Sequence, residues 1–154
     1  MGARVRIRRN GYAMSTTIRC DIVSAHRKIF SGQVKMCVVS GTTGELGIYP
    51  RHAPLMTTLK PGPVRVQQPD GEELIFFVGG GILEVMPHLV TVLADTAIRA
   101  DDLDEAAAIQ ARDEAERQLK DRTGELEVAE AQAKLAEAMA QLQALEHLRR
   151  KFKR

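Results

Sequence analysis

Apolar and polar residues alternate with a period of two along the first two thirds of the chain, to about residue 98. Such short runs recur every ~8–12 residues with turn-forming residues between them, which is typical of an all-β sandwich or barrel. They predict strands over residues 18–22, 34–39, 64–66, 74–78, 82–86 and 89–93, with a hairpin turn at Asp70-Gly71. No helical pattern separates successive strands, so a parallel Rossmann-type sheet is excluded.

After residue 99 the pattern changes to that of helices. Ala, Glu, Arg, Gln and Leu dominate and no proline follows, which gives a high helix propensity. Asp101 and Asp102, with Glu105 three residues after the second, predict a capped helix start. A break at Gly124 then predicts helices over residues 103–121 and 126–152. The predicted fold class is α+β: an N-terminal all-β sandwich, residues 14–99, followed by a C-terminal antiparallel two-helix hairpin, residues 100–154.

The two predicted helices differ in the size of their apolar faces. The first offers mainly alanines, with Ile109 and Leu119 as its larger members. The second carries one stripe of large residues: Val128, Leu135, Met139, Leu142, Leu145, Leu148 and Phe152. Helices gain most of their stability from packing, so we predict that the hairpin docks only marginally and that the longer helix can leave to bind another protein. A hairpin folded back on the sheet is the alternative, and both states coexist when they differ by a few kcal/mol.

Composition excludes several classes of protein. A chain of 154 residues with 44% hydrophobic and 27% charged residues is typical of a soluble globular protein, and its net charge of +2 points to no particular partner. Residues 1–13 form a basic extension without the apolar run of a signal peptide, and we expect it to be disordered or not native. No segment reaches the ~20 apolar residues of a membrane-spanning helix, so we expect no direct membrane insertion.

No arrangement of residues predicts a catalytic or metal site. The glycine runs at 41–44 and 79–81 lack the Lys-Ser/Thr pair and the following helix of a phosphate loop, which favours tight β turns. The four histidines have no partner four residues away and no nearby cysteine. Cys20 and Cys37 lack metal-type spacing and are predicted to be core residues. Acidic residues at 101–105 suit a helix start, so we expect no active site and no cofactor.

The most distinctive segment is Gly44-Glu45-Leu46-Gly47-Ile48-Tyr49-Pro50-Arg51-His52-Ala53-Pro54-Leu55. Its prolines fix φ and its glycines permit positive φ, which together predict a stiff, shaped loop. The loop would present Glu45, Tyr49, Arg51 and His52. Such loops on small β domains usually serve for binding, so the segment predicts a contact surface for another molecule.

The basic end of the second predicted helix has two interpretations. Arg149, Arg150 and Lys151 suit the negative end of the helix dipole and keep a helix soluble. Alternatively, they extend an amphipathic helix into a cationic tip that fits an acidic protein groove. The groove is favoured because the apolar stripe lies on the same helix. Phe152 is the only aromatic residue there, so nucleic-acid binding is weakly supported.

Several segments, in order, resemble the ε subunit of bacterial F-type ATP synthases. They are residues 21–25, 30–32, 44–54, 80–85, 90–97 and 102–106, and the resemblance extends from Ile18 to Lys153. It implies a flattened sandwich of about ten strands followed by two antiparallel helices. It also implies a non-catalytic subunit of the central stalk, peripheral to the cytoplasmic face of the bacterial inner membrane.

The resemblance further implies partners and residue roles. Glu45, Tyr49, Arg51 and His52 would contact the membrane rotor ring, the c-ring, and one face of the sandwich would bind the γ subunit. The C-terminal helix would enter the catalytic head of α and β subunits and inhibit ATP hydrolysis. The residues implied in that inhibitory contact are Leu142, Leu145, Arg149, Arg150 and Lys151.

One departure from the family pattern concerns ATP. Some members bind ATP near the hairpin start through a motif with an arginine three residues after an aspartate. Here Ala107 stands at the arginine position after Asp104, which removes a bidentate phosphate donor. Arg99 and Asp104 remain as a weak candidate nucleotide site, so we expect weak or absent ATP sensing. A free-standing β-domain adaptor that binds protein or nucleic acid through its basic helix remains the alternative function.

Overall fold

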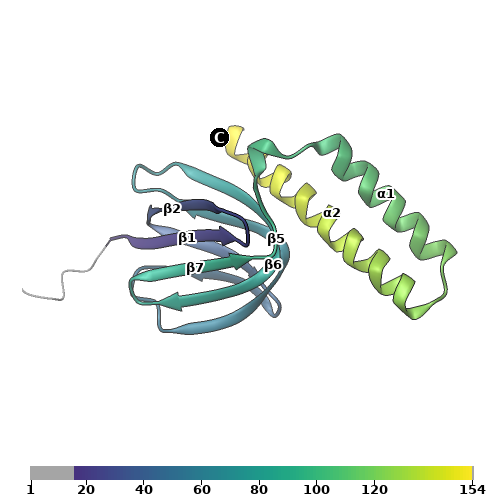
Figure 1. Cartoon of the computed structure of the whole chain (residues 1–154). Helices are drawn as coiled ribbons and strands as arrows, with labels where there is room; N and C mark the ends of the chain where they lie inside the picture. The colour runs from purple at the N-terminus through teal and green to yellow at the C-terminus, as the bar shows by residue number, and fades with distance from the viewer. Residues whose placement is uncertain (1–15, 154) are drawn as a thin grey trace, which may run out of the picture.

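The computed structural model describes residues 16–153, which form a β sandwich followed by two antiparallel helices (Figure 1). The basic extension expected at residues 1–13 lies outside the described residues. The strands are β1 (Ile18–Ser24), β2 (Lys28–Val34), β3 (Met36–Gly41), β4 (Gly44–Ile48), β5 (Leu55–Gln67), β6 (Glu73–Met86), β7 (Leu89–Ala94) and β8 (Ala97–Arg99). A 3-10 turn η1 (Ala100–Asp102) leads to helices α1 (Glu105–Asp121) and α2 (Glu125–Phe152).

Within residues 16–153 the strands lie in the order β2-β1-β7-β6-β5-β3-β4, and β8 pairs with β6. Neighbouring strands are antiparallel except β1 and β7, which run parallel. Since β1 and β7 run the same way, the start of β1 and the β6–β7 turn lie at the same end of the sandwich. The β1–β2 turn therefore lies at the opposite end.

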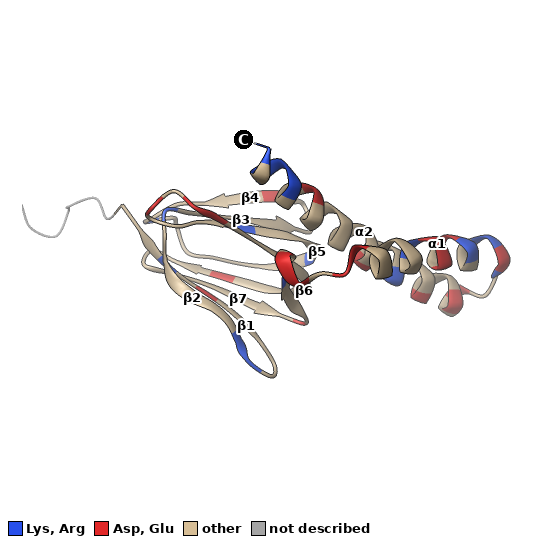
Figure 2. Ribbon diagram, turned by 90° about the horizontal axis from the view of Figure 1, so that it is seen from above, with Lys and Arg blue, Asp and Glu red and all other residues tan. Residues whose placement is uncertain are grey.

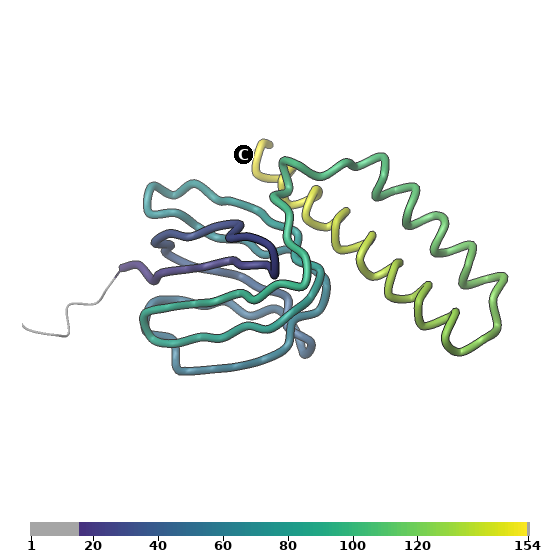
Figure 3. The backbone as a smooth tube through the Cα atoms, viewed as in Figure 1, coloured from purple at the N-terminus to yellow at the C-terminus, as the bar shows by residue number. Residues whose placement is uncertain are grey.

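The two longest strands explain how the sheet closes into two layers. β5 and β6 have 13 and 14 residues and pair along their length, yet β6 contacts β8 through residues 76–78 and β7 through residues 81–86. The chain bends between these halves (Figure 3), where Gly80 and Gly81 have φ of +102° and +138°. A Cβ at Gly81 would overlap the carbonyl of Leu93. Each long strand thus serves both layers, which accounts for the about ten strands expected of the sandwich.

The sandwich core consists of large side chains that are completely buried. Phe76 and Leu83 are 0% exposed, and Phe76 packs on Phe30 with ring centroids 5.7 Å apart. Cys20 and Cys37 lie in this core as free thiols, which confirms the prediction from their spacing. Contact with Cys20 and burial both raise the pKa of the Cys37 thiol well above its usual value.

Two expectations for the β region were wrong in detail. Residues 44–55 were expected to form a loop, but Gly44–Ile48 is strand β4, which pairs with β3 and buries Ile48 completely. Glycine has a low strand propensity. The local sequence pattern therefore underestimates a strand that forms by pairing with a neighbouring strand. The run 34–39 was expected to be one strand, but it divides at Lys35 into the end of β2 and the start of β3.

The helical hairpin has the predicted order with shifted helix starts. The side chain of Asp104 accepts a hydrogen bond of 3.1 Å from the Ala107 amide, so Asp104 caps α1. Asp101 and Asp102 belong instead to η1. The predicted cap was therefore wrong, because neighbouring acidic residues suit a helix start equally well. The helices begin at residues 105 and 125 rather than 103 and 126.

The helices meet through small side chains. Within the described residues, α1 packs mainly against α2. Apart from Ala140 and Ala144, which pack on the sheet, the fully buried residues of the two helices are Ala108 and Ala115 on α1 and Ala131 and Ala138 on α2. We call these four residues the alanine seam. None of the larger stripe residues is fully buried, and Met139 and Phe152 remain 43% and 73% exposed. The short neighbour therefore covers the stripe only partly, as its composition predicted.

The C-terminal half of α2 docks on β5 and β6, so the structure shows the folded-back arrangement. Ala140 and Ala144 are buried there against Ile75 and Phe77 of β6, with Leu148 at the margin. These small residues allow the helix to lie close to the sheet. Figure 1 shows the remainder of the hairpin extending beyond the sandwich.

Candidate functional site

The loop at residues 49–54 closes the end of the sandwich away from the hairpin (Figure 1). The Arg51 amide donates to the carbonyl of Pro87 at 3.0 Å, which ties the loop to the β6–β7 turn. The His52 amide donates to the carbonyl of Tyr49 at 3.1 Å. Tyr49 and Arg51 are exposed and His52 is half-buried, so the loop is shaped and accessible as its prolines predicted.

Glu45 does not lie with the other predicted contact residues. It is near the start of β4, and three strand residues lie between it and Tyr49, which puts the two about 13 Å apart. Its carboxylate forms an ion pair of 3.2 Å with Arg65 and lines a hollow under α2 with His147 and Arg150. The structure thus divides the predicted group between the loop and the docking surface of α2.

Exposed apolar residues gather on the outer face of β5, β6 and β7. We call Met56, Ile82, Met86 and Leu93 the outer-face patch; they are 68%, 43%, 44% and 46% exposed. Ile82 lies opposite Leu93 in the ladder. The sequence pattern missed this surface because strand periodicity identifies two faces but not which apolar residues stay uncovered. A signal was present in residues 82–86, where apolar residues occupy both faces. A gathered apolar surface on a soluble protein commonly marks a contact with a partner.

The hollow under α2 is open to solvent and has a volume of about 520 Å³. Its charged lining residues are Glu45, Arg65, Glu72, Glu73, Arg150 and Lys151, and His147 lies among them. Lys151 forms an ion pair of 3.6 Å with Glu72 and donates a hydrogen bond to the backbone carbonyl of Glu73. These contacts fasten the end of α2 to the start of β6.

The residues predicted to meet the catalytic head therefore have contacts within the chain. Arg149 pairs with Glu105 at the start of α1, which raises the pKa of the guanidinium. Arg150 pairs with Glu146 one turn earlier, at 3.5 Å. Leu142 and Leu145 are half-buried. Figure 2 shows the basic residues gathered at the C-terminal end of α2.

His147 lies between positive charges. Its imidazole is partly desolvated, and with the guanidinium groups of Arg65 and Arg150 this lowers its pKa from the usual value. Glu45 and Glu73 oppose the shift without cancelling it. The docked helix thus favours neutral His147.

The candidate nucleotide residues make contacts within the chain. Arg99 pairs with Asp101 at 3.7 Å, and its guanidinium carbon lies 6.0 Å from the centroid of the Phe76 ring. The carboxylate of Asp104 caps α1, and Ala107 offers only its amide. Both residues thus make contacts within the chain, and the weak nucleotide site stays a prediction.

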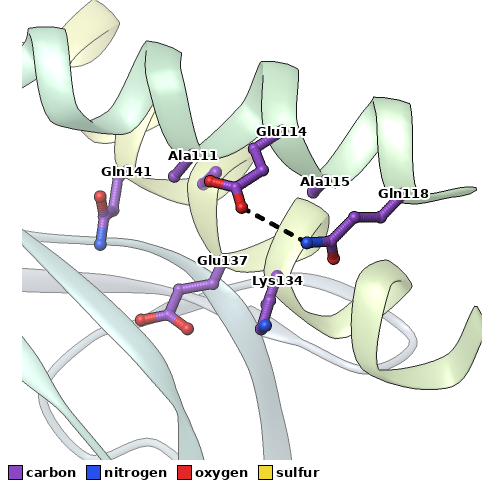
Figure 4. A pocket seen from close by; sticks show the side chains of 8 residues that line it. Ala111, Glu114, Ala115, Gln118, Lys134, Glu137 and Gln141 are labelled. Atoms are coloured by element: carbon purple, nitrogen blue, oxygen red, sulfur yellow. Dashed lines mark hydrogen bonds between the residues drawn. The ribbon is translucent and has the colours of Figure 1, made fainter. Parts of the chain in front are cut away.

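A second hollow of about 270 Å³ lies between the two helices (Figure 4). Alanines line it together with Glu114, Gln118, Lys134 and Glu137, and the Gln118 amide donates to Glu114 at 3.4 Å. It contains neither Arg99 nor Asp104. In residues 16–153 no group of three or more His, Cys, Asp or Glu side chains is placed to hold a metal ion. Neither described helix combines the length and apolar character of a membrane-crossing helix.

Similarity to known proteins decides the family. The family model for the ATP synthase delta/epsilon chain β-sandwich domain matches residues 17–100, and that for the long α-helix domain matches residues 101–146. An ATP synthase epsilon chain of Stenotrophomonas maltophilia is 62% identical over 138 residues, covering 90% of this chain and 99% of the relative. One from Nitrosococcus oceani is 59% identical over 139 residues with the same coverage. The chain belongs to the ATP synthase epsilon chain family.

Two solved ATP synthase structures contain a chain with the same fold. A chain of the Euglena gracilis mitochondrial ATP synthase, solved with OSCP, F1 and the c-ring, has a TM-score of 0.80 at 19% identity, covering 88% of this chain and 85% of its own. A chain of the Tetrahymena thermophila central stalk and c-ring has a TM-score of 0.56 at 12% identity, covering 83% and 96%. Epsilon chains are non-catalytic subunits of the F-type ATP synthase, so family membership decides against the free-standing adaptor.

Proposed function

We propose that this epsilon chain is the rotor subunit of a bacterial F-type ATP synthase that couples the membrane ring to the catalytic head and restrains ATP hydrolysis through α2. It acts as a peripheral subunit at the cytoplasmic face of the inner membrane. The observation that carries the regulatory part is the docking of α2, which rests on alanines and surface ion pairs and not on a large apolar core. Such a contact can open and close.

The loop end of the sandwich is the proposed contact with the ring. Tyr49, Arg51 and His52 lie there, on the side away from the hairpin, so a partner can bind them while α2 is docked. We assign Glu45 to the docking of α2 instead, because its carboxylate pairs with Arg65 under that helix. The loop is held by backbone hydrogen bonds at both sides of Arg51, so little conformational entropy is lost on binding.

The outer-face patch is the proposed contact with the γ subunit. Its four residues are the exposed apolar members of three adjacent strands, and Met86 immediately precedes the β6–β7 turn that holds the loop. Met is enriched at protein interfaces, whereas Lys and Glu are depleted. One continuous surface could therefore bind γ on the face and the ring at the end.

The inhibitory part uses the released α2. A helix of 28 residues is about 42 Å long, enough to enter a central cavity between subunits. Release breaks the Arg149–Glu105 and Lys151–Glu72 pairs, each worth about 0–1 kcal/mol at an exposed site. Leu142, Leu145 and the basic residues 149–151 then become available to the α and β subunits. Their gain in the head can offset the modest loss at the sandwich.

ATP has no part in holding α2 in this proposed role. The only residues in the family's nucleotide positions with suitable side chains, Arg99 and Asp104, are engaged by Asp101 and by the start of α1. Arg149 instead pairs directly with Glu105, so the folded-back state has a contact of its own without a ligand.

The test is ATP hydrolysis by the assembled complex with the intact chain and with a chain ending at Gly124. We expect truncation to raise hydrolysis while the complex stays assembled. Unchanged hydrolysis in an assembled complex would contradict an inhibitory α2. A sharper version keeps the full chain and replaces Arg149, Arg150 and Lys151 by alanine. We expect this variant also to raise ATP hydrolysis in the assembled complex. Its matched control removes three cations from α1, at Arg112, Arg117 and Lys120, and should hydrolyse ATP at the parental rate.

A further inference from the structure

Acidic residues from two other elements hold the basic end of α2. Lys151 pairs with Glu72, which immediately precedes β6, at 3.6 Å between Nζ and a carboxylate oxygen. Arg149 pairs with Glu105, the first residue of α1. The two acids thus reach the same helix end from the sandwich and from the start of the hairpin. Together we call Glu72 and Glu105 the acidic clamp.

The turn that carries Glu72 does not depend on its carboxylate. The Glu72 amide donates to the carboxylate of Asp70 at 2.9 Å, and its carbonyl accepts from the Gln68 amide at 2.7 Å. These main-chain bonds shape the turn, whereas the exposed side chain of Glu72 pairs with Lys151. A glutamine at this position therefore keeps the turn and removes the charge.

The start of α1 does not depend on Glu105 for its cap. Asp104 supplies the cap through its bond to the Ala107 amide, whereas the carboxylate of Glu105 contacts Arg149 and raises the pKa of its guanidinium. An acid in a first helical turn also interacts favourably with the helix dipole. A control for Glu105 therefore needs an acid in the same position of another helix.

The clamp holds the same cations that a released α2 would offer to the catalytic head. While Arg149 and Lys151 pair with the clamp they cannot pair with acidic groups elsewhere. The apolar part of the docking is small, because the buried residues of α2 on the sheet are Ala140 and Ala144. Removing an interaction that exists only in the docked state shifts the equilibrium towards release by the free energy lost.

We propose that the acidic clamp is an internal competitor of the catalytic head for the basic end of α2, and that it sets how strongly this chain inhibits ATP hydrolysis. The inference rests on the proposed inhibitory role of α2 and adds its regulation. The cations of α2 act in both states, whereas the clamp acts only in the docked state. Loss of the clamp should therefore strengthen inhibition, although loss of the cations should weaken it.

The test replaces both acids of the clamp, Glu72→Gln with Glu105→Gln, in the full chain. We expect ATP hydrolysis by the assembled complex to fall about two- to fivefold, because exposed ion pairs are individually weak. In the isolated full chain, amide hydrogen exchange in the last turns of α2 should rise by a similar factor. The matched control is Glu116→Gln with Glu125→Gln. It removes two exposed acids from the hairpin, one of them in the first turn of α2, and both readouts should stay parental.

The outcomes separate the inference from the proposed function. If truncation at Gly124 raises hydrolysis but the clamp variant hydrolyses ATP at the parental rate, the inference fails and the inhibitory α2 stands. A rise of hydrolysis in the clamp variant would also overturn the inference, since the clamp would then support inhibition. Equal changes in the clamp variant and its control would mean that net charge, not the clamp, is responsible. If truncation has no effect, the proposed inhibition fails and the inference with it.

Discussion

The sandwich and the hairpin bury apolar residues in different ways. The sandwich encloses large side chains such as Ile22, Phe76 and Leu83 completely, whereas every fully buried residue of the two helices is an alanine. Complete burial of a large apolar side chain contributes about 1.5–3 kcal/mol, and one methyl-sized group about 0.8 kcal/mol. Each buried alanine of the hairpin therefore contributes less stabilising free energy than each large buried side chain of the sandwich.

The difference assigns the two regions to different tasks. A region with a deep core can change shape only if it loses most of its free energy of unfolding. Such a region can hold a contact surface in place. A region with few large buried contacts opens at low cost. The hairpin adds exposed ion pairs such as Arg149–Glu105, which contribute about 0–1 kcal/mol each. Regulation is therefore expected in the hairpin and partner attachment in the sandwich.

The largest expected effect comes from removing a core side chain of the sandwich. Phe76→Ala leaves a cavity between the two layers and should lower the free energy of unfolding by about 3–5 kcal/mol. Urea unfolding followed by circular dichroism measures the change. Phe152→Ala in α2 is the matched control, because that ring is 73% exposed, and it should change stability by less than about 0.5 kcal/mol. Equal effects of the two substitutions would remove the distinction between the regions.

The sequence predicts the division between the regions because the hydrophobic period changes from two to that of a helix near residue 99. It does not predict β4, because glycines weaken the local strand signal and pairing with β3 supplies the strand. It also does not predict that Asp104 caps α1, since Asp101, Asp102 and Asp104 all suit a helix start. Local patterns thus predict elements and leave their ends to tertiary contacts.

The candidate sites show the same limit. The shaped loop at Tyr49–Pro54 follows from prolines within a few residues of each other, so the sequence predicts it. The placement of Glu45 depends on Arg65 and on His147, about a hundred residues away, and no local pattern contains that contact. Similarly, helical spacing predicts the large stripe on α2 but not that alanines make the closest contacts. Distance along the chain separates what can be predicted from what cannot.

A smaller effect is expected where the two regions meet. Ala144→Leu puts a larger side chain where α2 packs on Phe77, and such overpacking costs about 1–3 kcal/mol. We expect faster amide hydrogen exchange in the C-terminal half of α2, while the sandwich strands stay protected. Ala136→Leu is the matched control, because residue 136 is exposed on the same helix. Both substitutions replace alanine by leucine, so they change the helix propensity equally. Acceleration of exchange by both substitutions alike would show that docking at Phe77 does not hold the helix.

The smallest expected effect is a dependence of docking on pH through His147. Burial and the positive charges of Arg65 and Arg150 lower its pKa in the docked state, against the opposing Glu45 and Glu73. In a released helix the histidine has its ordinary pKa of ~6.5, so the released state binds more protons and acid favours release. Docking should be constant above that pH and weaken as pH falls from there through the lowered pKa.

Amide exchange in α2, corrected for the intrinsic effect of pH on exchange, measures this dependence between neutral and mildly acidic conditions. The corrected exchange should rise with acid in the parent chain and stay nearly constant in His147→Gln. His88→Gln, in the β6–β7 turn at the far end of the sandwich, is the matched control and should retain the parental dependence. The same dependence in His147→Gln would mean that another group responds to acid. In that case Glu72 becomes the next group to replace, since its carboxylate pairs with Lys151 at the end of α2.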